Sequence, residues 1–247
     1  MSDVDPAELE RARSAALARA VAPLLPQLAT PTLVIDLDAV DHNVAAMLRR
    51  LDGAAGRWRP HVKTVKQPTI IGALMDAGVH RFKAATPAEV ALVLETAELR
   101  TLPEPVDVLL AYPAAPPQLA AMLDLRREHS DARIGLLADS PGHAEELVRG
   151  IGTPTGLPAF DLWLDVDVGM HRTGSHAEVW RHAELAESPW LRLAGLHGYE
   201  GHLHWHDHAA ATAAYDALCE LARALPRPAL QLCTSGTHAY AHALAHA

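Results

Sequence analysis

The feature that most constrains the fold is a repeated alternation between short β-branched, apolar segments and helical segments of about ten residues. Strand composition marks residues 32–37, 57–63, 81–84, 106–111, 133–138, 160–168, 193–199 and 230–234. Helical periodicity marks residues 41–51, 68–77, 87–98, 116–128, 141–149, 177–186 and 209–225, after a first helical stretch within 5–28. Capping residues before proline, as at Thr86-Pro87 and Ser140-Pro141, support several helix starts. The alternation predicts βαβ units and a parallel sheet.

A parallel sheet of this kind is either open and doubly wound or closed into a barrel. The sequence has no GxGxxG after its first strand and no GxxxxGK[ST], the two glycine-rich motifs typical of open nucleotide-binding sheets. We therefore predict an α/β fold, a TIM-type (β/α)8 barrel over residues 30–247, preceded by an N-terminal helical extension over residues 1–29. Seven βα-type strands follow segment 32–37, whereas a closed barrel has eight. We expect an incomplete barrel.

Charge and composition narrow the class of partner. The formal net charge of −9 leaves no basic excess to bind a phosphate backbone or anionic lipid, which excludes nucleic acid and membrane partners and favours a small molecule. No apolar run is long enough to span a bilayer, and the acidic N-terminus does not have the pattern of a signal peptide. Cys219 and Cys233 lack metal-site spacing and indicate structural thiols in a reducing compartment. We expect a cytoplasmic protein.

The first candidate site is RWRPHVKTVKQP, which carries two of the three lysines of the chain, Lys63 and Lys66. In a strand, period-two alternation places Arg59, His61 and Lys63 on one face. A lysine buried beside a second cation has a lowered pKa and more of the neutral amine that Schiff-base formation needs. The spacing supports equally well a Lys63 that extends to solvent at the strand end and pairs with a carboxylate.

The second candidate is DLWLDVDVGMHRTG, residues 161–174. It places Asp165 and Asp167 on one strand face and then turns through Gly169 to His171 and Arg172. This brings charge to the carboxyl end of a strand, where the active sites of such barrels lie. In the structural alternative the carboxylates are hydrogen-bonded within the fold and Arg172 is their ion-pair partner.

Two further candidates follow near the C-terminus. In LHGYEGHLHWHDH, His197 and Tyr199 share a strand face, and histidines then occupy every second position from His202 to His208. Such histidines can ligate a metal, but no carboxylate or thiolate is regularly spaced with them, so we predict no metal site in this loop. In CTSGTHAY, the backbone N–H groups and the hydroxyls of Ser235 and Thr237 fit a phosphate, although many turns have this composition.

Taken in order, the motifs TPTLVIDLDAVDHNV, RPHVKTVKQP, ATPAEV, VDVLLAYP, VDVGMHRTG, GLHGYEGHL and TSGT resemble the pyridoxal-phosphate enzymes of fold type III. The resemblance runs from about residue 30 to 240 and is closer to the D-threonine aldolase and D-serine dehydratase branch, which is related to the alanine racemase N-terminal barrel. It implies pyridoxal 5'-phosphate as cofactor. The site residues that it implies are Lys63 as the Schiff-base lysine, His202 as a catalytic residue near the cofactor ring, Arg172 at the phenolic oxygen, Tyr199 at the strand end, and Ser235, Gly236 and Thr237 in the phosphate cup.

The resemblance further implies a lyase that acts on a D-amino acid, cleaving a β-hydroxy-D-amino acid to glycine and an aldehyde as a D-threonine aldolase does. The alternatives are a D-serine dehydratase-type deamination, an amino-acid racemase, and a protein that binds pyridoxal phosphate without catalysis. Family members form homodimers, and their divalent-metal ligands lie in a C-terminal β-domain that this chain lacks. We therefore expect either a fragment or a shortened relative, and the sequence leaves open whether it is active alone.

Two local departures from the family pattern concern the cofactor site. Val65 stands where the family often has a histidine between two lysines, and the turn after Cys233 has a single glycine, Gly236, where the phosphate cup is usually richer in glycine.

Overall fold

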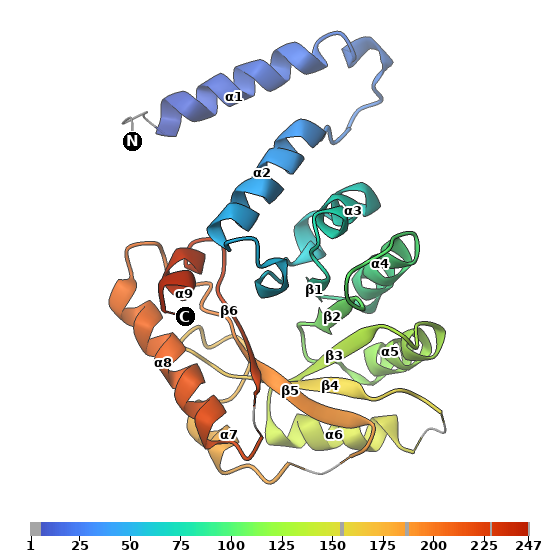
Figure 1. The fold of residues 1–247 in the computed structure, drawn as a ribbon, viewed down its shortest axis with the longest axis vertical. Helices are drawn as coiled ribbons and strands as arrows, with labels where there is room; N and C mark the ends of the chain where they lie inside the picture. The colour runs from blue at the N-terminus through green and yellow to red at the C-terminus, as the bar shows by residue number, and fades with distance from the viewer. Residues whose placement is uncertain (1–5, 154–155, 186–187, 228, 247) are drawn as a thin grey trace. The chain divides into compact units, whose positions relative to one another are not determined.

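The computed structural model describes residues 6–153, 156–185, 188–227 and 229–246 (Figure 1). The chain divides into two compact units, Met1–Ala46 and Met47–Ala247. The first unit contains α1 (Pro6–Val21), a 3₁₀ turn (Leu25–Gln27) and the start of α2 (Leu37–Arg50). This contact boundary falls within α2, and the predicted division into a 1–29 extension and a 30–247 barrel stays a prediction. Among the described residues, no helix combines the length and apolarity that crossing a bilayer requires.

The predicted strand at 32–37 is wrong. Residues 32–36 are assigned to no strand, and Leu33 is 77% exposed. The Asp36 carboxylate accepts the N–H of Ala39 at 3.1 Å and so caps α2. Helix α2 therefore begins at Leu37, four residues before the predicted helix start at residue 41, and the β-branched run ends there. A β-branched run forms a strand only where a neighbouring strand supplies hydrogen-bonding partners, and no ladder in the described structure includes this one.

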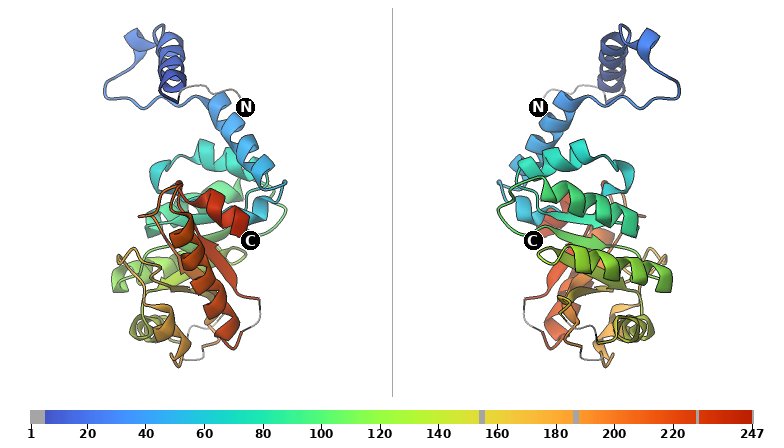
Figure 2. Two further views of the ribbon diagram at one scale, coloured as in Figure 1. Left: turned by 90° about the vertical axis from the view of Figure 1, so that its left-hand side faces the viewer. Right: turned by 90° about the vertical axis from the view of Figure 1, so that its right-hand side faces the viewer.

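The second unit is built on a six-stranded sheet in which all neighbours are parallel and follow chain order. Its strands are β1 (Arg81–Ala84), β2 (Asp107–Leu110), β3 (Arg133–Ala138), β4 (Phe160–Asp165), β5 (Leu191–Gly198) and β6 (Gln231–Thr234). The strands curl into a half-barrel, with helices along its outer side (Figure 1, Figure 2). The predicted α/β fold, with a parallel sheet curled as in a barrel, is therefore confirmed, and the eight-stranded (β/α)8 barrel stays a prediction.

The helices between the strands begin where local capping signals occur. They are α3 (Pro68–Asp76), α4 (Pro87–Glu98), α5 (Pro116–Glu128), α6 (Pro141–Ile151), α7 (Ala177–Arg181), α8 (His208–Ala224) and α9 (Tyr240–His246). Thr86 and Ser140 cap α4 and α6 as predicted, each accepting the N–H three residues later at 3.2 Å. Helix α7 ends at Arg181, whereas the predicted helix runs to 186, and residue 186 lies outside the described residues.

The predicted strand at 57–63 is largely wrong. It is flanked by 3₁₀ turns at Ala55–Arg57 and Val62–Thr64 and joins the sheet through one isolated parallel bridge, His61 to Lys83. Lys83 donates its N–H to the Pro60 carbonyl at 2.9 Å, but Pro60 has no N–H to return. A proline beside an early turn thus reduces the segment to a single rung next to β1.

Side chains on the inner sheet face form three layers. Near the strand starts lie paired charges: Arg133 contacts Asp161 at 2.7 Å, and Asp107 contacts Arg59 at 2.6 Å. The middle layer is apolar, with Leu109, Leu137, Trp163 and Cys233 in one buried cluster. Trp163 fits because the adjacent strands carry glycine at Gly135 of β3 and Gly195 of β5, where an added Cβ would lie 2.9 Å and 2.6 Å from its ring. The third layer, at the carboxyl ends, is polar.

Candidate active site

The polar layer brings together three buried side chains from three strands. Lys83 of β1 lies with its Nζ 3.1 Å from Nε2 of His197 on β5. The Nδ1 of His197 lies 2.7 Å from Oδ1 of Asp165 on β4. Asp165 and His197 are direct neighbours in the β4–β5 register, and each side chain of the trio is less than 10% exposed. The half-barrel thus aligns Lys83, His197 and Asp165 in one hydrogen-bonded row.

The chemistry of the row fixes the proton positions. An ammonium group only donates, so Nε2 of His197 accepts from Lys83 and Nδ1 carries the proton that is donated to Asp165. Burial and the positive charge of Lys83 lower the pKa of His197, although Asp165 opposes this shift. His197 is therefore neutral at neutral pH. The second carboxylate oxygen of Asp165 is buried without a hydrogen-bond partner among the described residues.

The predicted residues Lys63, Arg172 and Tyr199 meet beside this row. The centroid of the Tyr199 ring lies 5.8 Å from Nζ of Lys63, 5.8 Å from Nζ of Lys83 and 4.8 Å from Cζ of Arg172. Lys63 reaches the ring from the 3₁₀ turn after His61, and Arg172 from the loop after β4. Three cations thus surround one aromatic ring at the carboxyl ends of the strands.

The loop that carries Arg172 is shaped by Asp167. Its Oδ1 accepts the N–H groups of Gly169 and His171, both at 3.0 Å, and its Oδ2 lies 2.7 Å from Nδ1 of His171. Burial alone would raise the pKa of Asp167, but these hydrogen bonds outweigh burial and lower it. The Asp167 carboxylate therefore holds the loop in its conformation through these hydrogen bonds. A small hollow at the loop is lined by Asp165, Val166, Asp167, Met170, Arg172, Thr173 and Tyr199.

Of the two interpretations of Lys63 that the spacing left open, burial beside Arg59 is wrong. Arg59 lies in the lower layer, where it makes two hydrogen bonds to the Asp107 carboxylate at 2.8 Å and 2.6 Å and lies over Trp163. Lys63 is exposed instead. Although Arg59 and Lys63 are four residues apart, the intervening Pro60 and 3₁₀ turn separate them along the barrel axis. Lys66 forms an ion pair with Glu89 at 3.1 Å.

The predicted phosphate turn is held by an internal carboxylate. Glu200, which is fully buried, accepts the N–H groups of Ser235 and Gly236, each at 3.1 Å. It also accepts the hydroxyls of Thr234 at 3.0 Å and Tyr215 at 3.2 Å. The two backbone amides of the predicted phosphate cup therefore already have a partner. The turn still borders the site.

That proximity follows from glycine at position 236. A Cβ added to Gly236 would lie 3.2 Å from Cε2 of Tyr199, which is tighter than a normal carbon contact. The turn of Ser235, Gly236 and Thr237 thus lies directly against the ring that Lys63, Lys83 and Arg172 surround.

The predicted catalytic His202 lies beside the Arg172 loop. Its Nε2 is 3.5 Å from the position of a Cβ at Gly169, and its side chain is exposed. The later histidines contact one another, with the rings of His204 and His206 stacked at 5.7 Å and His204 5.5 Å from His238. In the described part of the chain, no group of three or more His, Cys, Asp or Glu side chains is arranged to hold a metal.

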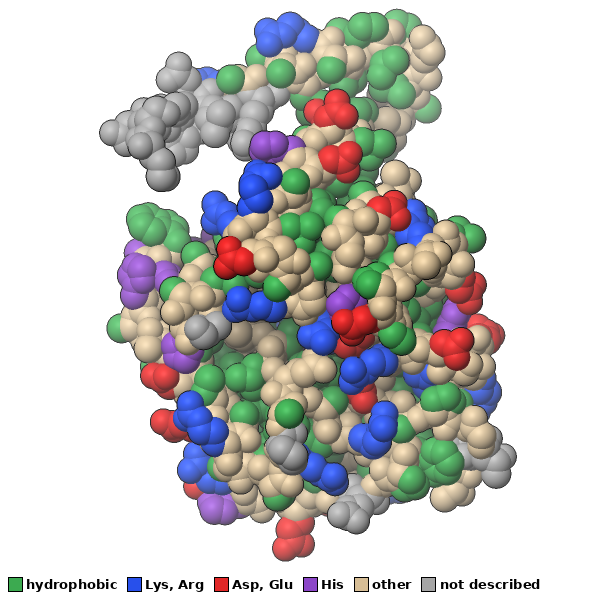
Figure 3. Space-filling model, in the orientation of Figure 1, with side chains coloured by type: hydrophobic (Ala, Val, Ile, Leu, Met, Phe, Trp, Pro, Cys, Tyr) green, Lys and Arg blue, Asp and Glu red, His purple; other side chains and the backbone are tan. Residues whose placement is uncertain are grey.

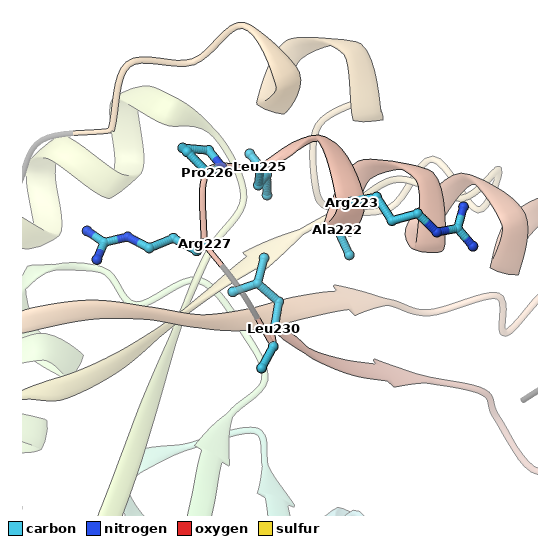
Figure 4. A pocket seen from close by; sticks show the side chains of 7 residues that line it. Ala222, Arg223, Leu225, Pro226, Arg227 and Leu230 are labelled. Atoms are coloured by element: carbon cyan, nitrogen blue, oxygen red, sulfur yellow. The ribbon is translucent and has the colours of Figure 1, made fainter.

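A larger hollow than the one beside Arg172 lies away from this site. It measures about 480 Å³ and is lined by Ala222, Arg223, Leu225, Pro226, Arg227, Ala229 and Leu230, between the end of α8 and the start of β6 (Figure 4). These residues lie at the amino end of β6, opposite Tyr199, and include no carboxylate, imidazole or thiol. On the face shown in Figure 3, acidic and basic side chains are intermixed.

Comparison with known proteins gives the class. The family described as alanine racemase, N-terminal domain, matches residues 35–247. The D-threo-3-hydroxyaspartate dehydratase of Delftia sp. (strain HT23) is 35% identical over 151 residues, which cover 61% of this chain and 37% of that protein. Its solved structure has a TM-score of 0.62 at 28% identity, covering 85% of this chain and 60% of that one.

A D-threonine aldolase structure from Filomicrobium marinum shares the fold, with a TM-score of 0.71, 22% identity, and coverage of 88% of this chain and 59% of that one. These likenesses and the parallel half-barrel define the barrel of fold type III pyridoxal-phosphate enzymes, which confirms the resemblance drawn from the motifs. The chain belongs to the alanine racemase N-terminal domain family, and the similar proteins named here are enzymes. It spans between 37% and 60% of their length.

Proposed function

We propose that this chain is the barrel part of a pyridoxal-phosphate-dependent lyase that cleaves a β-hydroxy-D-amino acid to glycine and an aldehyde. The observation that carries the proposal is the convergence of Lys63, Lys83 and Arg172 on Tyr199 at the carboxyl ends of the strands. The dehydratase relative and the aldolase fold support a substrate that is a hydroxylated D-amino acid. The homodimer and the divalent metal that the resemblance implies stay predictions.

The residues present fit pyridoxal phosphate. The cations of the site outnumber its carboxylates, so it suits an anionic ligand, and the unpartnered oxygen of Asp165 can accept a hydrogen bond from a donor group of a polar ligand. We assign the exposed Lys63 amine to cofactor attachment. Arg172 is assigned to the cofactor's ring oxygen and Tyr199 to the ring. When bound, pyridoxal phosphate supplies an aldehyde that reacts with amines and a ring that withdraws electrons from the substrate's Cα.

The phosphate assignment has to account for Glu200. Because the N–H groups of Ser235 and Gly236 donate to Glu200, we assign the phosphate to the Thr237 N–H and to the hydroxyls of Ser235 and Thr237. His202, exposed beside the Arg172 loop, is assigned to proton transfer at the open side of the site. The protein's part in the reaction is to orient the substrate bond that is to break.

A second candidate function is dehydration, which expels hydroxide from a β-hydroxy-D-amino acid and yields a keto acid and ammonia. The 35% identity to a D-threo-3-hydroxyaspartate dehydratase favours it specifically. Both reactions start from the same class of substrate and differ in which bond to Cα is aligned for cleavage. Product analysis separates them: glycine and an aldehyde in one case, a keto acid and ammonia in the other.

The test is an absorbance scan of the purified chain with pyridoxal phosphate, followed by borohydride reduction and peptide mapping. We expect a band beyond that of the free cofactor and a label on Lys63. Lys63→Ala should lose both, whereas Lys66→Ala, the matched control, should keep them because Lys66 pairs with Glu89. A label on Lys83 or Lys66 would overturn the Lys63 assignment, and a folded chain without any band would overturn cofactor binding.

A further inference from the structure

Lys83 is a buried cation without a carboxylate in contact. In the described part of the chain, its amine forms no ion pair and instead lies 3.1 Å from Nε2 of His197. Two other cations of the barrel contrast with it, since the buried Arg59 of the lower layer pairs with Asp107, and Lys66 pairs with Glu89. A structural lysine that is 7% exposed would be expected to contact a carboxylate directly. The imidazole partner therefore calls for a chemical explanation.

The row of Lys83, His197 and Asp165 can hold one proton in two places. With the proton on Lys83, His197 is neutral and donates its Nδ1–H to Asp165. If the Nζ–H bond breaks and an N–H bond forms at Nε2, Lys83 becomes a neutral amine with a free electron pair. The resulting imidazolium is then compensated by Asp165 at 2.7 Å, whose second oxygen has no other partner among the described residues. The row carries the same net charge in both arrangements, and each proton transfer takes place between two atoms that are already within hydrogen-bond distance.

The row borders the place where a substrate would lie. Nζ of Lys83 and Nζ of Lys63 are both 5.8 Å from the centroid of the Tyr199 ring. One amine is exposed and the other is buried and connected to a proton acceptor. This asymmetry separates two tasks that amines perform in enzymes, covalent attachment and proton transfer.

We propose that Lys83 is the proton-accepting residue of this site: it passes its proton to His197 and then takes the proton of the substrate's β-hydroxyl group. The inference rests on the proposed function. As the hydroxyl loses its proton, the C–O bond becomes the C=O bond of the aldehyde and the Cα–Cβ bond breaks. The electron pair of that bond stays with Cα, which takes one proton to give glycine. One proton leaves the substrate and one returns, so the row is restored.

The groups around the row suit this role. His61, the bridge partner of Lys83, has its pKa lowered to about 4 by burial and by the charges of Lys83 and Lys63, so it stays neutral and does not compete for the proton. The positive charge of Arg172 also lowers the pKa of His197, and Asp165 is the carboxylate that contacts the imidazole. The charges of Lys63 and Arg172 near the row make it easier for Lys83 to give up its proton, because like charges disfavour the protonated form.

The test compares Lys83→Arg and Lys83→Met with Lys66→Met in the cofactor-loaded full chain. Arginine keeps the charge and the hydrogen bond but does not release a proton. We expect both Lys83 variants to lower kcat for a β-hydroxy-D-amino acid by about 10²- to 10⁴-fold, the usual contribution of a general base, with KM changed by less than about threefold. The acidic limb of the kcat–pH profile, where a proton acceptor becomes protonated and inactive, should be lost in both Lys83 variants. Lys66→Met should match the unmodified chain.

A second readout uses the unloaded chain and does not depend on turnover. The ¹⁵N NMR signals of His197, assigned with His197→Gln, should show Nδ1 protonated at neutral pH, and Lys83→Met should raise the pKa of His197 because a lowering charge is removed. An active Lys83→Arg variant would overturn the inference and leave the proposed function intact. If the unmodified chain cleaves no β-hydroxy-D-amino acid, the proposed function fails. An unchanged His197 titration then overturns proton sharing as well.

Discussion

Glu200 offers the sharpest prediction about stability, because one carboxylate holds three parts of the barrel together. It follows β5, accepts the Tyr215 hydroxyl from α8, and accepts the N–H groups of Ser235 and Gly236 in the turn after β6. The side chain is 0% exposed, so water is not in contact with it in the folded chain. Replacing Glu200 with alanine removes all of these acceptors at once.

The magnitude follows from which donors have another partner. Tyr215 also donates to the Ala239 carbonyl at 3.3 Å, and the Thr234 hydroxyl to the Gly198 carbonyl at 2.8 Å, so these two lose little. The amides of Ser235 and Gly236 have no second acceptor among the described residues. A buried donor left without a partner costs about 1–3 kcal/mol, so Glu200→Ala should lower the free energy of unfolding by about 2–6 kcal/mol. Glu200→Gln keeps one oxygen and should cost about half as much.

Urea unfolding followed by tryptophan fluorescence measures this change, since Trp163 and Trp180 are both buried in the same unit. The matched control is Glu220→Ala, which removes an exposed carboxylate from α8 and should change the free energy of unfolding by less than about 0.5 kcal/mol. A loss below about 1 kcal/mol for Glu200→Ala, indistinguishable from the control, would refute the view that Glu200 holds the turn.

Three further outcomes follow from the charges. Arg59→Met should lower the free energy of unfolding by about 3–5 kcal/mol in urea, because Asp107 is left buried without its partner; a loss under about 1 kcal/mol would contradict this. The pKa of His61 is about 4 and that of His197 is also lowered, so the unfolded chain takes up protons first. Stability should therefore fall as the pH drops below about 6.5, and less steeply in His61→Asn. Burial, then the charge and hydrogen bond of Glu200, raise the pKa of Tyr215. Its contribution to stability is therefore present below its ordinary pKa of 10.0 and should be lost as the pH rises above it, an effect absent in Tyr215→Phe.

The fold could be predicted from sequence where the signals were local. Strands 81–84 and 133–138 and helices 87–98 and 116–128 agree with the structure to the residue, because a turn or a proline at the helix start marks each boundary. The segments 32–37 and 57–63 have strand composition too. Composition does not report whether a neighbouring strand is present, and this is what decides both segments.

The site was predictable in part for a similar reason. Lys63, Arg172 and Tyr199 are adjacent in space as expected, since polar residues at the ends of parallel strands converge. Lys83 was not singled out, because it is a lone cation in a four-residue strand and its partner His197 lies 114 residues away. Its position at the end of β1 was the available signal. Glu200 lies inside the YEGH motif, but its four donors come from segments that only the fold brings together.

The inner sheet face shows why charge alone does not identify the reactive residues of such a barrel. Arg59 and Lys63 would share one face of a regular strand, yet Arg59 pairs with Asp107 beneath the apolar layer of Trp163. Charges below that layer are matched, arginine to aspartate, and matched buried pairs contribute to specificity of folding rather than to chemistry. Above it, Lys63, Lys83 and Arg172 face a single ring, and the carboxylate nearest to them reaches Lys83 only through His197. Cations that have no direct carboxylate partner among the described residues are stable only beside solvent or an anionic ligand, so the imbalance between the two layers locates the chemistry at the carboxyl ends of the strands.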